Sequence, residues 1–265
     1  MKVFISADIE GVTGCTTWDE TEKDKSSYQV YAKQMTREVE AACVGANEAG
    51  AEEIIIKDAH DSGRNIDHSV LPLNTKLVRS WAGGLYSMVQ ELDSTFSALI
   101  YIGYHSAAGT DANPLSHTMN TMLDKIIING RVASEFLIHS YIAAYHNVPV
   151  VFLSGDKGLC KEAEAVVPGI KTVAVKEGRG NSTINIHPEL AVDLIKEGVK
   201  EALTGDLSRY KLQLPEEFNV SIRYKNHKDA YGKSHYPGVE IIDEHTICFN
   251  SKDYIEVLRL FNYVV

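Results

Sequence analysis

Two carboxylates lie close together at the end of the first apolar segment of this chain. Asp8 and Glu10 follow the strand-like run Val3–Ala7 and are separated by one residue, with Gly11 directly after them. Side chains two residues apart in an extended chain project from the same side. Two carboxylates held so close repel one another unless a cation or a shared proton lies between them. The pair alone also fits a solvated strand end before a turn, so its meaning depends on the rest of the chain.

More side chains able to bind a metal follow the ends of later apolar segments. They are Asp58 and His60 after the run 54–56, His105 after the run 98–103, and Glu135 beyond an Asn-Gly turn. The carboxyl ends of parallel strands share one edge of a sheet, where open α/β proteins bind ligands. A mixture of carboxylate and imidazole suits zinc, manganese or iron better than calcium or magnesium, which prefer oxygen alone.

One carboxylate can bridge two metal ions roughly 3.5–4 Å apart, and Asp8 is a candidate for that place. The candidate metal ligands are Asp8, Glu10, His60, His105 and Glu135. His117 follows a loop that leaves the His105 segment, so it could reach over the same site, although a lone histidine also fits a surface position. For His139, one helical turn from Glu135, support of a ligand or a core hydrogen bond is the favoured interpretation.

Composition and charge limit the partners of this chain. Its 265 residues are 44% hydrophobic and 23% charged, as in soluble globular proteins. A formal net charge of −10 argues against nucleic acid or an anionic membrane surface as the main partner. No apolar run approaches the length of a membrane span, about 20 residues, and no signal-peptide pattern precedes the first strand. The four cysteines are scattered, which indicates reduced thiols and a cytoplasmic protein.

Apolar runs alternate with segments of helical periodicity through most of the chain. Helices are predicted from Tyr28 to about Gly50, over 134–146 with Ser134 as a candidate cap, and near 159–167. This alternation predicts a three-layer α/β/α fold with a mainly parallel sheet. Because the pattern changes from about Pro188, we expect a metal-binding catalytic domain at 1–185 and a smaller C-terminal α/β subdomain at 186–265.

Motifs of several other catalytic classes are absent. The chain has no G-x-x-x-x-G-K-[ST] phosphate loop, no H-E-x-x-H helix and no G-x-S-x-G elbow. The D-x-H triplet Asp58–His60 and the pair Gly155-Asp156 leave a metallophosphoesterase open, although the G-N-H-[DE] element of such enzymes is missing. A metal- or peptide-binding scaffold without turnover is the other alternative.

Several motifs together resemble one family. The run Ser6–Gly14 resembles the S-x-D-x-E-G-x-x-G opening of the zinc-dependent D-aminopeptidases of the DppA type. Further matches follow in the same order: Lys57–His60 with Asn65, Gly103–His105, Ser116–Met119, Asn129–Arg131 leading to Glu135, and Val148–Asp156. The resemblance covers residues 1–180 well and the remainder only loosely.

The resemblance implies a dizinc metallopeptidase. The ligands it implies are Asp8 as the bridge, Glu10 and His60 for one zinc ion, and His105 and Glu135 for the other. It also implies that His117 is the catalytic histidine, and that a ring-stacked homodecamer encloses a chamber open to small peptides. The expected function is hydrolysis of short peptides, with an N-terminal D-amino acid such as D-alanine, by metal-activated water. Manganese or cobalt could replace zinc in such a mixed site.

Overall fold

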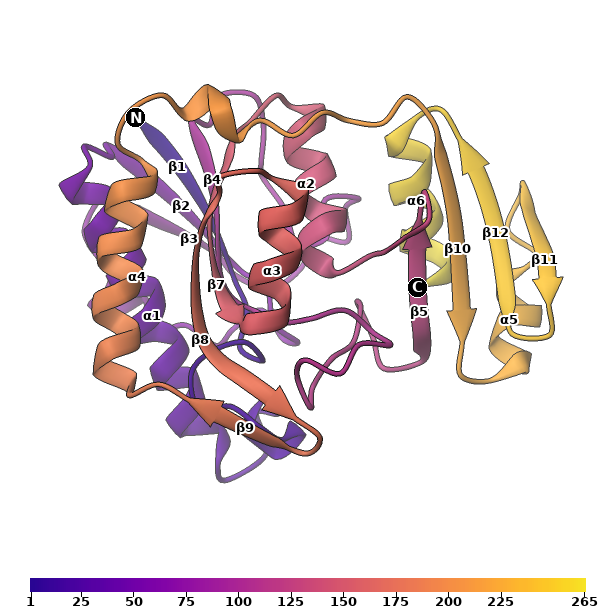
Figure 1. The fold of residues 1–265 in the computed structure, drawn as a ribbon, viewed down its shortest axis with the longest axis horizontal. Coiled ribbons are helices and arrows are strands. Elements are labelled where there is room, and N and C mark those ends of the chain that lie inside the picture. The colour runs from indigo at the N-terminus through magenta and orange to yellow at the C-terminus, as the bar shows by residue number, and fades with distance from the viewer.

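The computed structural model describes residues 1–265 as an α/β protein built around a seven-stranded sheet (Figure 1). The strands lie in the order β3-β2-β1-β4-β7-β8-β9. Their bounds are Lys2–Ala7 (β1), Glu53–Asp58 (β2), Thr75–Val78 (β3), Ala98–Tyr104 (β4), Val150–Asp156 (β7), Lys171–Arg179 (β8) and Ser182–Asn185 (β9). All neighbours are parallel except β9, which forms an antiparallel hairpin with β8. The predicted mainly parallel sheet is confirmed.

Helices cover both faces of this sheet, as the three-layer prediction requires (Figure 1). Helices α1 (Tyr28–Glu48) and α4 (Pro188–Ala202) pack together on one face, and α2 (Glu135–Tyr145) and α3 (Lys157–Val166) lie on the other. The predicted cap is present, because Ser134 Oγ accepts a hydrogen bond from the backbone N–H of Leu137 at 3.1 Å. None of the helices combines the length and the apolar character needed to cross a membrane.

A second, antiparallel sheet has the strand order β11-β12-β10-β5-β6. Its strands are Leu123–Ile128 (β5), Arg131–Val132 (β6), Phe218–Tyr224 (β10), Val239–Asp243 (β11) and Thr246–Ser251 (β12). Helices α5 (His227–Lys233) and α6 (Tyr254–Val264) accompany it, and α6 also packs against α2. The β5–β6 hairpin therefore belongs to the same sheet as strands from the last fifty residues. The boundary at 185/186 stays a prediction, and this hairpin lies on the N-terminal side of it.

The carboxyl ends of β1, β2 and β4 are aligned at one edge of the main sheet. Ala7 pairs with Asp58 on one side and with Ile102 on the other. The chain that follows β1 lies so close to β4 that the backbone N–H of Gly11 donates to the carbonyl of Gly103 at 2.8 Å. A Cβ atom added at Gly11 would lie 1.9 Å from the carbonyl oxygen of Tyr104, so only glycine fits there. This close contact brings the carboxylates after β1 against the histidine after β4.

Candidate metal centre

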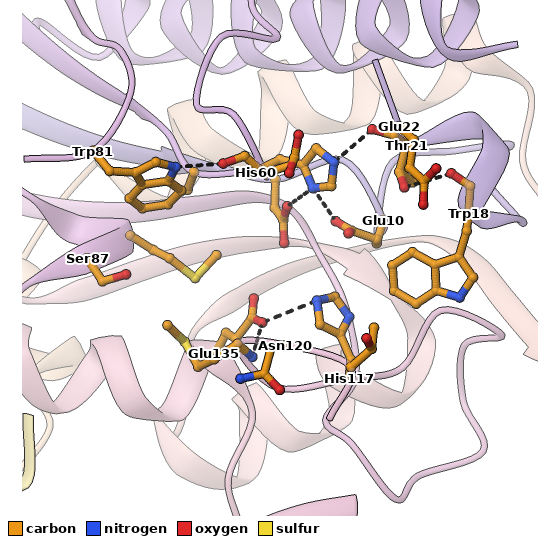
Figure 2. A pocket seen from close by; sticks show the side chains of 16 residues that line it. Glu10, Trp18, Thr21, Glu22, His60, Trp81, Ser87, His117, Asn120 and Glu135 are labelled. Atoms are coloured by element: carbon orange, nitrogen blue, oxygen red, sulfur yellow. Dashed lines mark hydrogen bonds and ion pairs between the residues drawn. The ribbon is translucent and has the colours of Figure 1, made fainter. Parts of the chain in front are cut away.

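A cavity of about 780 Å³ opens at this edge of the sheet. Asp8, Glu10, His60 and Glu135 contribute to its lining and are all buried. Figure 2 shows the side chains of Glu10, His60 and Glu135 converging from separate segments of the chain. The carboxylates and imidazoles that were scattered along the sequence therefore meet at one centre.

Asp8 lies between the two halves of this centre. Its Oδ1 is 3.4 Å from His60 Nδ1, and its Oδ2 is 3.4 Å from His105 Nε2. On the first side, Glu10 Oε2 lies 3.1 Å from His60 Nδ1. On the second side, Glu135 Oε2 lies 3.3 Å from His105 Nε2. A carboxylate whose two oxygens face two separate ligand sets has the geometry of a bridging ligand.

Three histidine rings are oriented by backbone carbonyls, so that one nitrogen of each faces the centre. In each ring the other nitrogen donates its hydrogen to a carbonyl oxygen. The pairs are His60 Nε2 with Thr21 at 2.9 Å, His105 Nδ1 with Ser106 at 3.0 Å and His117 Nδ1 with Leu115 at 2.9 Å. The nitrogens left over are therefore available to a cation, which is the usual arrangement of a metal-binding histidine.

Unpartnered polar atoms give a direct test of whether the residues fit a metal. Four buried side-chain nitrogen or oxygen atoms of this chain have no hydrogen-bond partner, and two of them are Glu10 Oε2 and His105 Nε2. A buried polar atom without a partner is costly in a folded protein. The donor atoms of Asp8, Glu10 and His105 lie within 4.8 Å of one another, and so do those of His105, His117 and Glu135. Mixed oxygen and nitrogen donors at this spacing fit zinc.

The carboxylates attract positive charge to the centre. Burial alone lowers the pKa of His60, but the carboxylates of Glu10 and Asp8 raise it well above its ordinary value. The pKa of His105 is raised in the same way, against its burial, by Glu135 and Asp8. Burial raises the pKa of Glu10, yet the neighbouring imidazoles bring it well below its ordinary value. The pKa of Glu135 is also lowered, against its burial, by His105, whereas burial and the charge of Glu10 raise the pKa of Asp8. Asp8 is therefore the carboxylate that most needs added positive charge to stay ionised.

His117 differs from the other two imidazoles in its access to the cavity. Its ring stacks on His105, with centroids 4.2 Å apart and an interplanar angle of 10°. Its side chain is 14% exposed, whereas that of His105 is fully buried. The ring also meets the edge of Trp18 at 5.2 Å, and its Nε2 lies 3.6 Å from Glu135 Oε1. Among the three rings, His117 is the most exposed to the cavity.

Two other strand-end carboxylates do not join the centre. Asp58 accepts hydrogen bonds from the backbone of Asn65 and Ile66 and from the Asn65 amide, at 2.5–2.9 Å. Asp156 accepts from the backbone N–H groups of Ser106 at 2.7 Å and Leu159 at 2.9 Å. Both therefore hold loops in place and have little capacity left for a metal.

Neither His139 nor Cys15 faces the centre as a ligand. His139 Nδ1 donates to the Glu135 carbonyl at 2.7 Å, and burial lowers the pKa of this ring. The Cys15 thiol is buried, and burial raises its pKa, so it stays protonated. The expected supporting role of His139 agrees with its contact, although that contact is with the backbone of Glu135.

Met119 is a site residue that sequence reasoning does not single out. Its φ is +65°, and the backbone N–H of Asn120 donates to the carbonyl of Thr118 at 2.8 Å, so Met119 is the central residue of a strained γ-turn. This turn points the Met119 N–H at Glu135 Oε1, at 2.6 Å. No glycine or asparagine marks the position, so the sequence gives no local signal for it.

Trp18 and Trp81 also line the cavity and lie on opposite sides of it in Figure 2. The Trp81 indole donates to the carbonyl of Asp61 at 2.6 Å, and the buried ammonium of Lys57 lies 3.9 Å from the ring centroid. These are the two tryptophans of the chain; Trp18 begins the short 3-10 helix η1 (Trp18–Glu20), and Trp81 lies in a loop. Their rarity was the available signal for a binding role.

Comparisons with known proteins agree on one family. The family model for D-aminopeptidases, Peptidase M55, matches residues 1–263. A D-aminopeptidase of Bacillus subtilis (strain 168) is 30% identical over 263 residues, 98% of this chain and 94% of its own length. A solved structure, described as the Zn-dependent D-aminopeptidase DppA from Bacillus subtilis, a self-compartmentalizing protease, superposes with a TM-score of 0.93. It is 28% identical, and the match covers 100% of this chain and 96% of that one.

The match extends through the C-terminal third, where the sequence motifs are sparse. The second sheet and α6 are therefore part of the shared fold. With the metal-binding geometry and the coverage of both comparisons, this chain belongs to the D-aminopeptidase family and is a hydrolase of the metallopeptidase class.

Proposed function

We propose that this protein is a dizinc aminopeptidase that removes an N-terminal D-amino acid, such as D-alanine, from short peptides. Asp8 would bridge the ions, Glu10 and His60 would hold one, and His105 and Glu135 the other. The observation that carries the proposal is the position of the Asp8 carboxylate, since one of its oxygens faces His60 and the other faces His105. The Zn-dependence of the related DppA supports zinc as the metal.

A bound pair of zinc ions supplies Lewis acidity toward a carbonyl and a water molecule acidic near neutral pH. The chain's own residues supply orientation and proton transfer. Backbone carbonyls fix the imidazole rings, and the Met119 N–H fixes the Glu135 carboxylate. Since the Nδ1 hydrogen of His117 is donated to Leu115, only the doubly protonated ring could give an Nε2 proton to the leaving amine or donate it to the oxyanion.

The charge of the cavity favours a substrate with a free amino group. Five carboxylate residues line it and no lysine or arginine does. With Asp8, Glu10 and Glu135 engaged by the metals, Asp61 remains to attract an ammonium group. It lies on the Trp81 side of the cavity, while Glu22 lies on the Trp18 side (Figure 2). The same charges repel a phosphate ester, and Asp58 and Asp156, on which a phosphoesterase would depend, are occupied by backbone donors.

The related DppA is described as self-compartmentalizing, which supports a homo-oligomer for this chain as well. We propose the homodecamer of the family resemblance, acting in the cytoplasm on small peptides that reach an enclosed chamber. Manganese or cobalt could occupy the same donors in place of zinc. Mass measurement of the native assembly tests the number of subunits.

The decisive experiment measures hydrolysis of D-Ala and L-Ala p-nitroanilides by chelator-treated protein, before and after zinc is returned. We expect no cleavage without metal and zinc-restored cleavage of the D form. Restored cleavage of the L form alone would keep the mechanism and reject the stereochemistry. Bound zinc without cleavage of either form would favour the binding scaffold, and release of phosphate from a nitrophenyl phosphate would favour the phosphoesterase.

A further inference from the structure

A second cavity of about 180 Å³ adjoins the metal centre. Three residues, Ser87, Met119 and Asn120, line both cavities, so the two spaces share one wall. The strained turn at Met119 forms part of that wall, and a methionine side chain adapts its shape readily. The second cavity therefore lies against the main one as a side cavity, across this shared wall.

Six of the ten residues that line this side cavity are apolar, and the other four are uncharged polar residues or histidine. The apolar side chains come from the loop before η3 (Ser87–Val89), from α2 and from α6. The apolar residues are Leu85, Met119, Ile138, Leu258, Phe261 and Val265. No aspartate, glutamate, lysine or arginine side chain is in the lining, in contrast to the acidic main cavity. Such a lining suits a hydrocarbon group and disfavours a charged one.

The position of the side cavity indicates which part of a peptide it receives. His117 and Trp18 lie on the side of the centre opposite Ser87 in Figure 2. If His117 protonates the leaving amine, the part of the peptide beyond the scissile bond lies toward Trp18. The residue that carries the free amine then lies toward Ser87 and Asn120, at the wall of the side cavity.

We propose that the side cavity receives the side chain of the N-terminal residue and gives the enzyme a preference for a leucine- or phenyl-sized apolar group over alanine. This inference rests on the proposed aminopeptidase function. An apolar protein cavity of about 150 Å³ holds a benzene molecule, so the space of about 180 Å³ is large enough for such a group. Each added methylene in a hydrophobic pocket typically changes discrimination by at least about tenfold.

The test measures kcat/KM for p-nitroanilides of alanine, leucine and phenylalanine in both configurations. We expect the wild type to favour leucine over alanine by at least about tenfold. Leu85→Trp narrows the side cavity and should reduce this ratio by about tenfold. Leu73→Trp is the matched control, because Leu73 is fully exposed and lines neither cavity, and it should leave the ratio unchanged.

A second test uses one variant that enlarges the cavity and one control. It keeps the proposal testable if Leu85→Trp does not fold. Leu258→Ala should raise the phenylalanine-to-leucine ratio by about tenfold. Leu260→Ala is the control, because Leu260 is a buried leucine of the same helix that does not line the cavity. It should lower stability about as much as Leu258→Ala and leave the phenylalanine-to-leucine ratio unchanged.

Two results would overturn the inference in different ways. The wild type could cleave alanine substrates without preferring larger groups, or all four variants could have the same leucine-to-alanine and phenylalanine-to-leucine ratios. Either result rejects the role of the side cavity and leaves the aminopeptidase proposal standing. No cleavage of any anilide after zinc is returned rejects the aminopeptidase proposal and this inference with it.

Discussion

Two groups of buried carboxylates lie at the same edge of the main sheet and have different neighbours. Asp8, Glu10 and Glu135 face imidazole nitrogens, and Glu10 keeps an oxygen without a hydrogen-bond donor. Asp58 and Asp156 also end parallel strands, but backbone N–H groups of neighbouring loops surround them. The first group forms the candidate metal centre, and the second holds the loops around it.

The difference shows that position at a strand end does not by itself make a carboxylate a ligand. Hydrogen bonds from several N–H groups stabilise an ionised carboxylate and leave few lone pairs for a cation. A carboxylate without such donors needs positive charge nearby, from a proton, an imidazolium or a metal. The supply of donors around each side chain therefore separates the two groups.

Asp8→Asn should break the metal centre most completely. The amide keeps the shape of the side chain but removes the charge that faces both His60 and His105. We expect zinc content to fall at both positions and kcat/KM to fall by more than about 10³-fold. Metal analysis after dialysis, with kinetics, measures both, and Asp193→Asn on the exposed side of α4 is the control. Two tightly retained zinc ions would reject the bridging role.

His117→Ala tests whether metal binding and catalysis depend on different residues. The carboxylates and the other two imidazoles remain, so zinc content should stay near that of the wild type. Turnover should fall by about 10²–10³-fold, the typical effect of losing one donor to a developing charge. An unchanged kcat with normal zinc content would remove His117 from the mechanism.

Asp58→Asn tests the supporting group. One oxygen becomes an NH₂ group that faces the N–H donors of Asn65 and Ile66, so at least one hydrogen bond to a charged acceptor is lost. We expect the free energy of unfolding in urea to fall by about 2–3 kcal/mol. Zinc supplied in excess should still bind the folded fraction. A loss below about 0.5 kcal/mol would mean that Asp58 does not hold this loop.

Glu38 is a carboxylate that belongs to neither group. Its Oε1 accepts from Thr13 and Gln34, while its Oε2 is buried without a partner and no imidazole is bonded to it. Burial raises the pKa of Glu38 from 4.5 to about 7. The folded protein then binds more protons than the unfolded chain between these two pH values, so stability decreases as pH rises through them.

Glu38→Gln should therefore remove part of the decrease in stability that the wild type shows as pH rises. The stability of the variant relative to the wild type should rise by about 2 kcal/mol between pH 5 and pH 8. Urea unfolding of both metal-free proteins across this range measures the difference. Parallel curves for the two proteins would mean that Glu38 is ionised in the folded state.

Local patterns in the sequence were sufficient to predict the parallel sheet and to propose the candidate ligands. The carboxylate pair, the strand-end histidines and the capped helix at Ser134 all depend on residues close together in the chain. The pairing of β5 with β10 depends on segments about ninety residues apart, so no local pattern indicates it. The exposed strand β11 and the short strand β3 were missed because neither has a continuous apolar run.

The supporting details of the centre were beyond sequence reasoning for a different physical reason. The donors to Asp58 and Asp156, and the N–H of Met119, are backbone groups, which every residue but proline carries. Their direction depends on loop conformation, including a positive φ at a methionine. Residue type therefore indicated what could bind a metal but not which carboxylates would be free to do so.

The carbonyls of Thr21, Ser106 and Leu115 fix the three histidine rings, and they belong to separate segments of the chain. Hydrogen bonds within the folded chain thus contribute to the orientation of each ring. A preorganised centre of this kind differs from a zinc finger, whose folding is driven by its ion. The protein should pass through repeated cycles of metal removal and return while it remains folded.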